Sequence, residues 1–130
     1  MKKRFNTKVI HSGHGTDKET GGVMPPIHLS TTFKQNEPGE FKYEYARTKN
    51  PSRDVLENLL AELESGEQAF AFASGMAAIN TVCDMFGSDY HIICSDDVYG
   101  GTRRLFDKVK SNIDVTYIAF DKNVNWEEVV

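Results

Sequence analysis

A short run of small residues at positions 73–78, Ala-Ser-Gly-Met-Ala-Ala, could bind a phosphate group. The pattern places it where a buried strand turns into a helix, so the backbone N–H groups of Gly75 and Met76 would point out of the helix N-terminus. The helix dipole makes that end positive, and it can hold an anion without a charged side chain. On this segment alone, a turn that only packs a helix on a sheet remains the alternative.

A second candidate segment, Asp-Asp-Val-Tyr-Gly-Gly-Thr-Arg-Arg at 96–104, follows another apolar run. In open α/β sheets, ligands bind beyond the carboxyl ends of the strands, which is where this loop would fall. Tyr99 would offer a flat ring to a planar ligand, and the two glycines after it allow the chain to bend. Arg103 and Arg104 face different ways on a helix, so at most one would reach the same site. An acidic turn with a structural tyrosine is the alternative.

A third segment, Tyr-Glu-Tyr-Ala-Arg at 43–47, lies in a polar part of the chain. Arg47 can grip a phosphate with paired donors, and Tyr45 adds a hydroxyl from the same face of an extended segment. A solvated surface segment is the alternative. His11, His14 and the other histidines lack the spacing of a ligand set, so we expect no metal site.

The elements that would position these residues begin near Asn50. Residues 1–49 contain many glycines and prolines and little apolar periodicity, which predicts an extended arm laid on another surface of the same chain or of a neighbouring subunit. Residues 50–130 alternate between helix and strand patterns. This alternation predicts an α/β domain with a mainly parallel sheet. The expected helices cover 51–65, 76–86, a segment from 100 and one begun by Asn123 or Asn125, and the expected strands cover 69–73, 91–94 and 115–120.

Composition narrows the class of protein. The chain has 130 residues, a net charge of −4, 39% hydrophobic and 26% charged residues, which is typical of a folded soluble domain. That charge would not attract nucleic acid or an anionic membrane, and no apolar stretch approaches the length of a membrane span. Cys83 and Cys94 lack the spacing of a redox or metal motif, so we expect reduced thiols and a cytoplasmic protein.

Four segments together resemble one enzyme family: 25–33, 45–53, 71–78 and 97–102, in the family's order and spacing. This is the trans-sulfuration, or Cys/Met metabolism, group of fold-type I enzymes that use pyridoxal 5'-phosphate (PLP). The resemblance covers the chain from about His11 onward. It implies an aminotransferase-like large domain whose first part is 50–130, an arm at 1–49 that contacts a neighbouring subunit, and a homotetramer of dimers with shared sites.

The resemblance also implies roles for individual residues. Gly75 and Met76 would give backbone donors to the PLP phosphate, and Tyr99 would stack on the pyridine ring as a catalytic residue. Tyr45 and Arg47 would reach the phosphate in the partner subunit's site. Arg104 matches an arginine near the substrate end of the pocket. Methionine gamma-lyases typically carry cysteine at the position of Gly101, which makes that activity a poorer match.

For the parent protein, the resemblance implies a carbon–sulfur lyase that splits cystathionine by γ-elimination to cysteine, 2-oxobutanoate and ammonia. Synthase and β-lyase members are the immediate alternatives. The lysine that binds PLP and the aspartate at its ring nitrogen are expected after Val130, so residues 1–130 alone should be inactive. A catalytically inactive subunit-pairing module is the alternative from another class. A nucleotide-binding domain is disfavoured because its glycine-rich motifs are absent.

Overall fold

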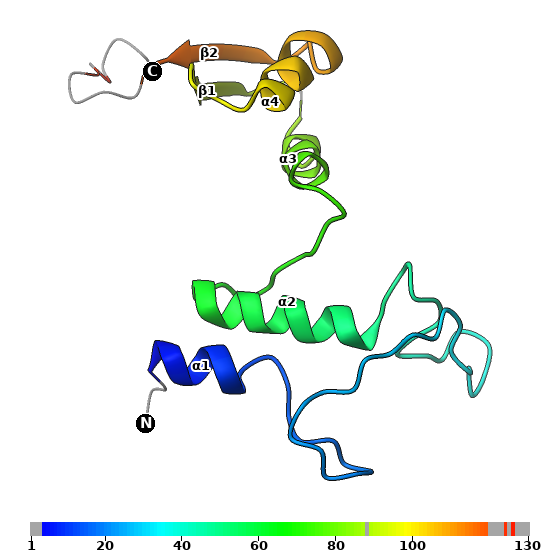
Figure 1. Cartoon of the computed structure of the whole chain (residues 1–130). Coiled ribbons are helices and arrows are strands. Elements are labelled where there is room, and N and C mark those ends of the chain that lie inside the picture. The colour runs from blue at the N-terminus through cyan, green and yellow to red at the C-terminus, as the bar shows by residue number, and fades with distance from the viewer. Residues whose placement is uncertain (1–3, 88, 120–123, 125, 127–130) are drawn as a thin grey trace. The chain divides into compact units, whose positions relative to one another are not determined.

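The computed structural model describes residues 4–87, 89–119, 124 and 126 (Figure 1). Its contacts divide the chain into two compact units, Met1–Ala71 and Phe72–Val130. The first unit contains α1 (Phe5–His11) and α2 (Pro51–Glu64). The second contains α3 (Gly75–Asp84), β1 (His91–Ser95), α4 (Gly100–Arg104), the π-helical turn η1 (Leu105–Val109) and β2 (Asp114–Ile118). Among these described residues, no helix is both long and apolar enough to cross a membrane.

Helix α2 begins where the sequence predicts, because its first residues cap it locally. Asn50 has an extended backbone, and its side-chain oxygen accepts a hydrogen bond from the Ser52 N–H at 2.8 Å. Pro51 follows at the first helical position, where the N–H that proline lacks has no helical partner. At the other end, Ser65 adopts a left-handed conformation, and its N–H bonds to the Ala61 carbonyl.

Helix α1 lies within the segment that the sequence predicts to be extended. Figure 1 shows it beside α2, and the Lys8 ammonium donates to the Glu62 carbonyl of α2 at 3.0 Å. A helix of seven residues is unstable in isolation and needs tertiary contacts. The extended description is therefore wrong for Phe5–His11, because α2 supplies contacts that local sequence does not reveal.

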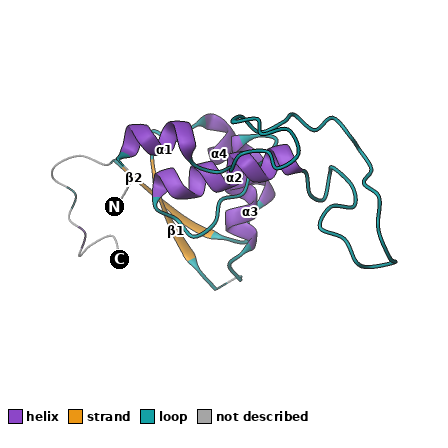
Figure 2. Cartoon of the chain, turned by 90° about the horizontal axis from the view of Figure 1, so that it is seen from below, coloured by secondary structure: helices purple, strands orange, loops and turns teal. Residues whose placement is uncertain are grey.

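The rest of the arm is mostly loop (Figure 2), and several hydrogen bonds tie it to the first turn of α2. The His28 N–H donates to the Ser52 hydroxyl at 2.9 Å, and the Tyr43 hydroxyl donates to the Asp54 carboxylate at 2.9 Å. Gly13 has a φ of +80° and packs so closely that a Cβ there would lie 2.6 Å from the Val55 carbonyl oxygen. The arm is thus laid on α2 of its own chain at these points.

The second unit contains a parallel pair of strands, β1 and β2, as the helix–strand alternation predicts (Figure 2). Their register runs from His91 opposite Asp114 to Ser95 opposite Ile118. A small core lies against them, formed by the buried side chains of Cys83, Leu105 and Phe106 and by half-buried apolar neighbours. The mixed α/β fold class is confirmed.

The apolar run 69–73 is not a strand in the structure, so that prediction is wrong. A strand needs a paired neighbour, and no described segment pairs with this one. The Ala71 N–H instead donates to the Glu57 carboxylate at 2.9 Å, and Phe70 is 70% exposed. The helix expected to begin at Asn123 or Asn125 lies outside the described residues.

Candidate functional site

The N-terminus of α3 presents free backbone donors. Ser74 caps the helix, and its hydroxyl oxygen accepts a hydrogen bond from the Ala77 N–H at 3.1 Å. Gly75 and Met76 occupy the first helical positions, so their N–H groups have no carbonyl of the preceding turn to bond. A Cβ built on Gly75 would meet no atom within 4 Å. An anion can therefore approach this positive helix end along the backbone.

Tyr99 lies just beyond the carboxyl end of β1, as predicted. A turn connects them, in which the Asp96 N–H donates to the Ile118 carbonyl at 2.9 Å and the Asp97 N–H to the Ser95 hydroxyl at 3.2 Å. Tyr99 is the residue that precedes α4, and its carbonyl accepts from the Thr102 N–H at 2.8 Å. Its side chain is 72% exposed, so the ring is available to stack on a planar ligand.

The structure brings Met76 and Tyr99 together around Gly101. A Cβ built on Gly101 would lie 2.6 Å from Cε1 of the Tyr99 ring and 3.2 Å from the Met76 sulfur. The Met76 side chain packs on the core of its unit. Its sulfur accepts a long hydrogen bond from the Thr102 hydroxyl at 3.7 Å. The first turn of α3 and an exposed aromatic ring are thus neighbours. Sequence reasoning gave Thr102 no role, because 26 residues separate it from Met76.

Of the two arginines on α4, Arg103 is engaged elsewhere. Its guanidinium lies 4.2 Å from the centre of the Tyr117 ring and 3.5 Å from the Asp107 carboxylate. The Tyr117 hydroxyl donates to Asp107 at 2.9 Å, and burial together with this bond raises the pKa of Tyr117. Arg104 is exposed, and its guanidinium has no partner within the described part of the chain. Arg104 is therefore the arginine available to a ligand.

Tyr45 and Arg47 form a separate pair in the unit Met1–Ala71. The Arg47 guanidinium lies 4.8 Å from the centre of the Tyr45 ring. Arg53 of α2 fixes the loop that carries them, since its guanidinium donates to the carbonyls of Ala46 at 3.3 Å and Thr48 at 2.7 Å. Sequence reasoning placed Arg53 in a family-like segment but gave it no role. The position of Arg53 in the first turn of α2, directly after the arm, is the sequence feature that indicates a role in holding the arm.

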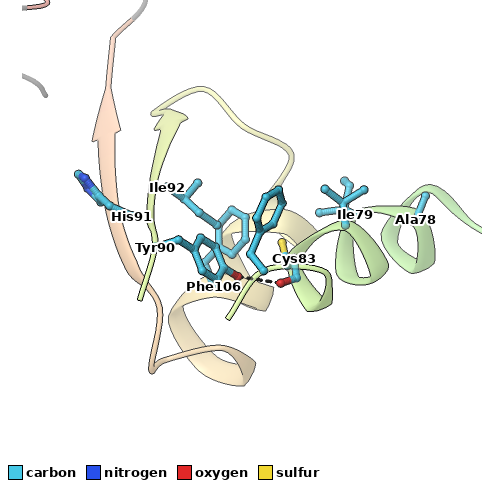
Figure 3. A pocket seen from close by; sticks show the side chains of 9 residues that line it. Ala78, Ile79, Cys83, Tyr90, His91, Ile92 and Phe106 are labelled. Atoms are coloured by element: carbon cyan, nitrogen blue, oxygen red, sulfur yellow. Dashed lines mark hydrogen bonds between the residues drawn. The ribbon is translucent and has the colours of Figure 1, made fainter. Parts of the chain in front are cut away.

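The second unit also has an apolar groove of about 580 Å³ along α3 and β1 (Figure 3). The Tyr90 hydroxyl, which donates to the Cys83 carbonyl at 2.9 Å, lies in this groove. The residues that line the groove include no lysine or arginine to bind an anion. The residues that line it are Ala78, Ile79, Val82, Cys83, Phe86, Tyr90, His91, Ile92 and Phe106. No cluster of three or more histidine, cysteine or acidic side chains placed to hold a metal occurs among the described residues.

Curated proteins with similar sequences are enzymes of cystathionine metabolism. The chain is 53% identical over 118 residues to cystathionine beta-lyase of Lactococcus lactis subsp. cremoris (strain MG1363), covering 90% of this chain and 31% of that protein. It is 48% identical over 116 residues to cystathionine gamma-lyase of Bacillus subtilis (strain 168), covering 88% and 30%. The chain thus spans about a third of the length of these relatives.

Solved structures and a family model agree with these likenesses. The crystal structure of cystathionine gamma-lyase from Lactobacillus plantarum, complexed with L-serine, superimposes with a TM-score of 0.79 at 48% identity. The match covers 92% of this chain and 31% of that one. The model of the Cys/Met metabolism PLP-dependent enzymes matches residues 6–130. Together with the α/β unit that carries Gly75 and Tyr99, this shows that the chain belongs to the PLP-dependent enzymes of cysteine and methionine metabolism.

Proposed function

We propose that the full-length protein is a PLP-dependent carbon–sulfur lyase that cleaves cystathionine. The observation that carries this proposal is the closeness of Met76, in the first turn of α3, to the exposed ring of Tyr99. Both side chains lie against Gly101. The relatives of this chain have enzyme names, which gives the alternative of an inactive pairing module no support.

The residues present fit PLP by their chemistry. The N–H groups of Gly75 and Met76 suit a phosphate dianion, because the helix dipole favours negative charge and the glycine leaves the approach open. The Tyr99 ring suits the flat face of a pyridine ring and orients it by stacking. When bound, PLP supplies an electron sink for charge that develops on the substrate. The exposed Arg104 guanidinium would bind a substrate carboxylate as paired donors.

The arm would serve a second copy of the chain. Tyr45 and Arg47 offer a hydroxyl and a guanidinium, which are donors that suit a phosphate, and Arg53 holds the loop that carries them. We infer that this pair completes the phosphate site of the partner subunit, within a homotetramer built from such dimers. A cytoplasmic location is supported by the free thiols of Cys83 and Cys94.

Within the lyase class, we propose γ-elimination, in which water and cystathionine give cysteine, 2-oxobutanoate and ammonia. The likeness to the Bacillus subtilis gamma-lyase supports this choice. Cleavage on the other side of the sulfur, to homocysteine, pyruvate and ammonia, is the second candidate. The 53% identity with the lactococcal beta-lyase favours that alternative.

Identification of the 2-oxo acid tests the proposal. The full-length protein, saturated with PLP, is incubated with cystathionine, and the products are separated by chromatography. Release of 2-oxobutanoate with one thiol is the expected result, and pyruvate would assign β-cleavage instead. The same protein stripped of PLP is the control. If neither 2-oxo acid forms in the PLP-saturated sample, the protein is not a cystathionine lyase.

A further inference from the structure

The loop that carries Tyr45 and Arg47 depends on one side chain of α2. The N–H groups of Thr48 and Lys49 both donate to the Tyr45 carbonyl at 3.0 Å, which closes the turn. The next three carbonyls all accept from the Arg53 guanidinium: Ala46 at 3.3 Å, Arg47 at 3.5 Å and Thr48 at 2.7 Å. Because a guanidinium is a rigid planar fork, its orientation fixes the shape of the turn.

Glu57, one turn further along α2, contacts this guanidinium through the nitrogen that the loop does not use. Its Oε1 lies 3.7 Å from the Arg53 Nε. The same oxygen accepts the Ala71 N–H at 2.9 Å. The side chains of Arg53 and Glu57 are 31% and 22% exposed, so water screens the pair only in part. The carbonyls of the loop carry partial charges, and Glu57 supplies a full negative charge beside the guanidinium.

We propose that Glu57 is a positioning residue for the phosphate site of the partner subunit. It keeps the Arg53 fork turned toward the loop, and the loop presents Tyr45 and Arg47 to the phosphate. The inference rests on the proposed function, because it assumes that this pair serves a second copy of the chain. Without the carboxylate, the long Arg53 side chain gains rotamer freedom and turns its charge to water, so the loop loses its fixed shape.

A second route from Glu57 would lead through Ala71 to the site of its own chain. Ala71 ends the unit that contains the arm, and α3 begins soon after it at Gly75. Glu57→Gln separates the two routes. Its amide oxygen still accepts the Ala71 N–H, whereas the charge that attracts Arg53 is gone. An effect of this substitution therefore reports on the contact with Arg53.

PLP titration of the cofactor-free full-length protein, followed by visible absorption, measures this effect. We expect Glu57→Gln to weaken PLP binding about two- to fivefold, the range of a partly exposed ion pair. Arg53→Met removes the carbonyl contacts as well and should weaken binding at least about tenfold. Glu64→Gln makes the same chemical change at the exposed last residue of α2 and should bind PLP as the wild type does. Equal affinities for Glu57→Gln and Glu64→Gln would contradict the proposal.

A double-mutant cycle shows whether Glu57 acts through Arg53. In an Arg53→Met background, which keeps the aliphatic stem, Glu57→Gln should cause no further loss of PLP affinity because no fork is left to orient. The same loss in both backgrounds would assign the effect to Ala71 and contradict the proposal. Thermal unfolding of each variant is followed in parallel. If Arg53→Met fails to fold, the exchange of subunits described next tests Glu57 without it.

Exchange of subunits shows in which site Glu57 acts. Glu57→Gln chains are mixed with an excess of chains that lack the PLP-binding lysine, so each active site takes its arm from the lysine variant. The PLP concentration for half-maximal activity on cystathionine should then return to the wild-type value. In the reverse mixture, wild-type chains meet an excess of chains with both changes, and this concentration should rise about two- to fivefold. The opposite pattern would place the action of Glu57 in its own chain and contradict the proposal.

The titrations separate this inference from the proposed function. A wild type that binds no PLP contradicts both. If Arg47→Ala weakens PLP binding and Glu57→Gln does not, only the inference is contradicted, because Arg47 then serves the phosphate without help from Glu57. A wild type that binds PLP but does not cleave cystathionine contradicts the lyase activity, and the titrations still decide the role of Glu57.

Discussion

Tyr99 is exposed because its backbone, and not its ring, takes part in the fold. Its carbonyl accepts hydrogen bonds from the N–H groups of Thr102 and Arg103 and so begins α4. The ring itself makes no contact that would bury it, and an aromatic side chain with 72% exposure has apolar surface to offer a ligand. At the scale of single residues, the site therefore depends on which atoms the local fold leaves free.

The first prediction is that Tyr99 holds PLP through its ring. Tyr99→Phe keeps the ring and should keep most of the PLP affinity of the full-length protein. Tyr99→Ala should lose the stacking interaction, about 0.5–1.5 kcal/mol, together with the packing around it. Equilibrium titration with PLP measures both. A Phe variant that binds as weakly as the Ala variant would show that the hydroxyl is decisive.

Cys94 provides a prediction that depends on pH. Burial raises the pKa of its thiol, and this outweighs the opposite effect of Arg103. The folded protein therefore keeps the proton to higher pH than the unfolded chain does, and this contribution to stability is lost as pH rises through the folded pKa. Native Cys94 should react with iodoacetamide more slowly than in urea, with its rate rising at higher pH. Mass spectrometry of the labelled peptide measures the labelling rate of Cys94. Identical pH profiles of this rate in the native protein and in urea would contradict the prediction.

At the scale of elements, α2 organises the arm through the residues at its N-terminus. Asn50→Ala removes the helix cap and its contact with the His28 carbonyl, so the free energy of unfolding should fall by about 1 kcal/mol. Asn50→Asp keeps the capping oxygen and is the matched control. Urea denaturation at a fixed protein concentration compares them. Equal losses in the two variants would show that the cap does not stabilise α2.

The elements that local sequence specifies were predictable, and those that depend on distant partners were not. Asn50 and Pro51 identify the start of α2, and the apolar residues of β1 and β2 identify two strands. The run 69–73 is also apolar, but it has no paired strand among the described residues. Helix α1 was not predicted because its stability depends on α2, through contacts such as that of Lys8 with Glu62.

The same distinction between local sequence and distant packing holds for the candidate site. Gly75, Met76 and Tyr99 were identifiable one by one, because a helix start and a loop after a strand are local features. Their closeness was not, since it depends on how α4 packs against α3. The closeness of Thr102 and Gly101 to Met76 depends on this packing as well.

At the scale of the whole molecule, the chain carries two groups of candidate site residues, one on each unit. Gly75, Met76 and Tyr99 belong to the unit Phe72–Val130, and Tyr45 and Arg47 belong to the unit Met1–Ala71. The central claim of the proposed function is that the first group holds PLP in its own subunit while the second serves the partner's site. Two chains would then be needed for each complete site.

Subunit complementation tests this claim most directly. Two inactive full-length variants are mixed, Arg47→Ala and one without the lysine that binds PLP, and subunit exchange is verified. Each mixed dimer should regain one intact site, so random exchange should restore about a quarter of the wild-type activity on cystathionine. A control mixture of the lysine variant with Tyr99→Ala should gain nothing over Tyr99→Ala alone, because both changes affect a chain's own site. If the Arg47→Ala mixture stays inactive after verified exchange, Arg47 acts in its own subunit and the shared site is contradicted.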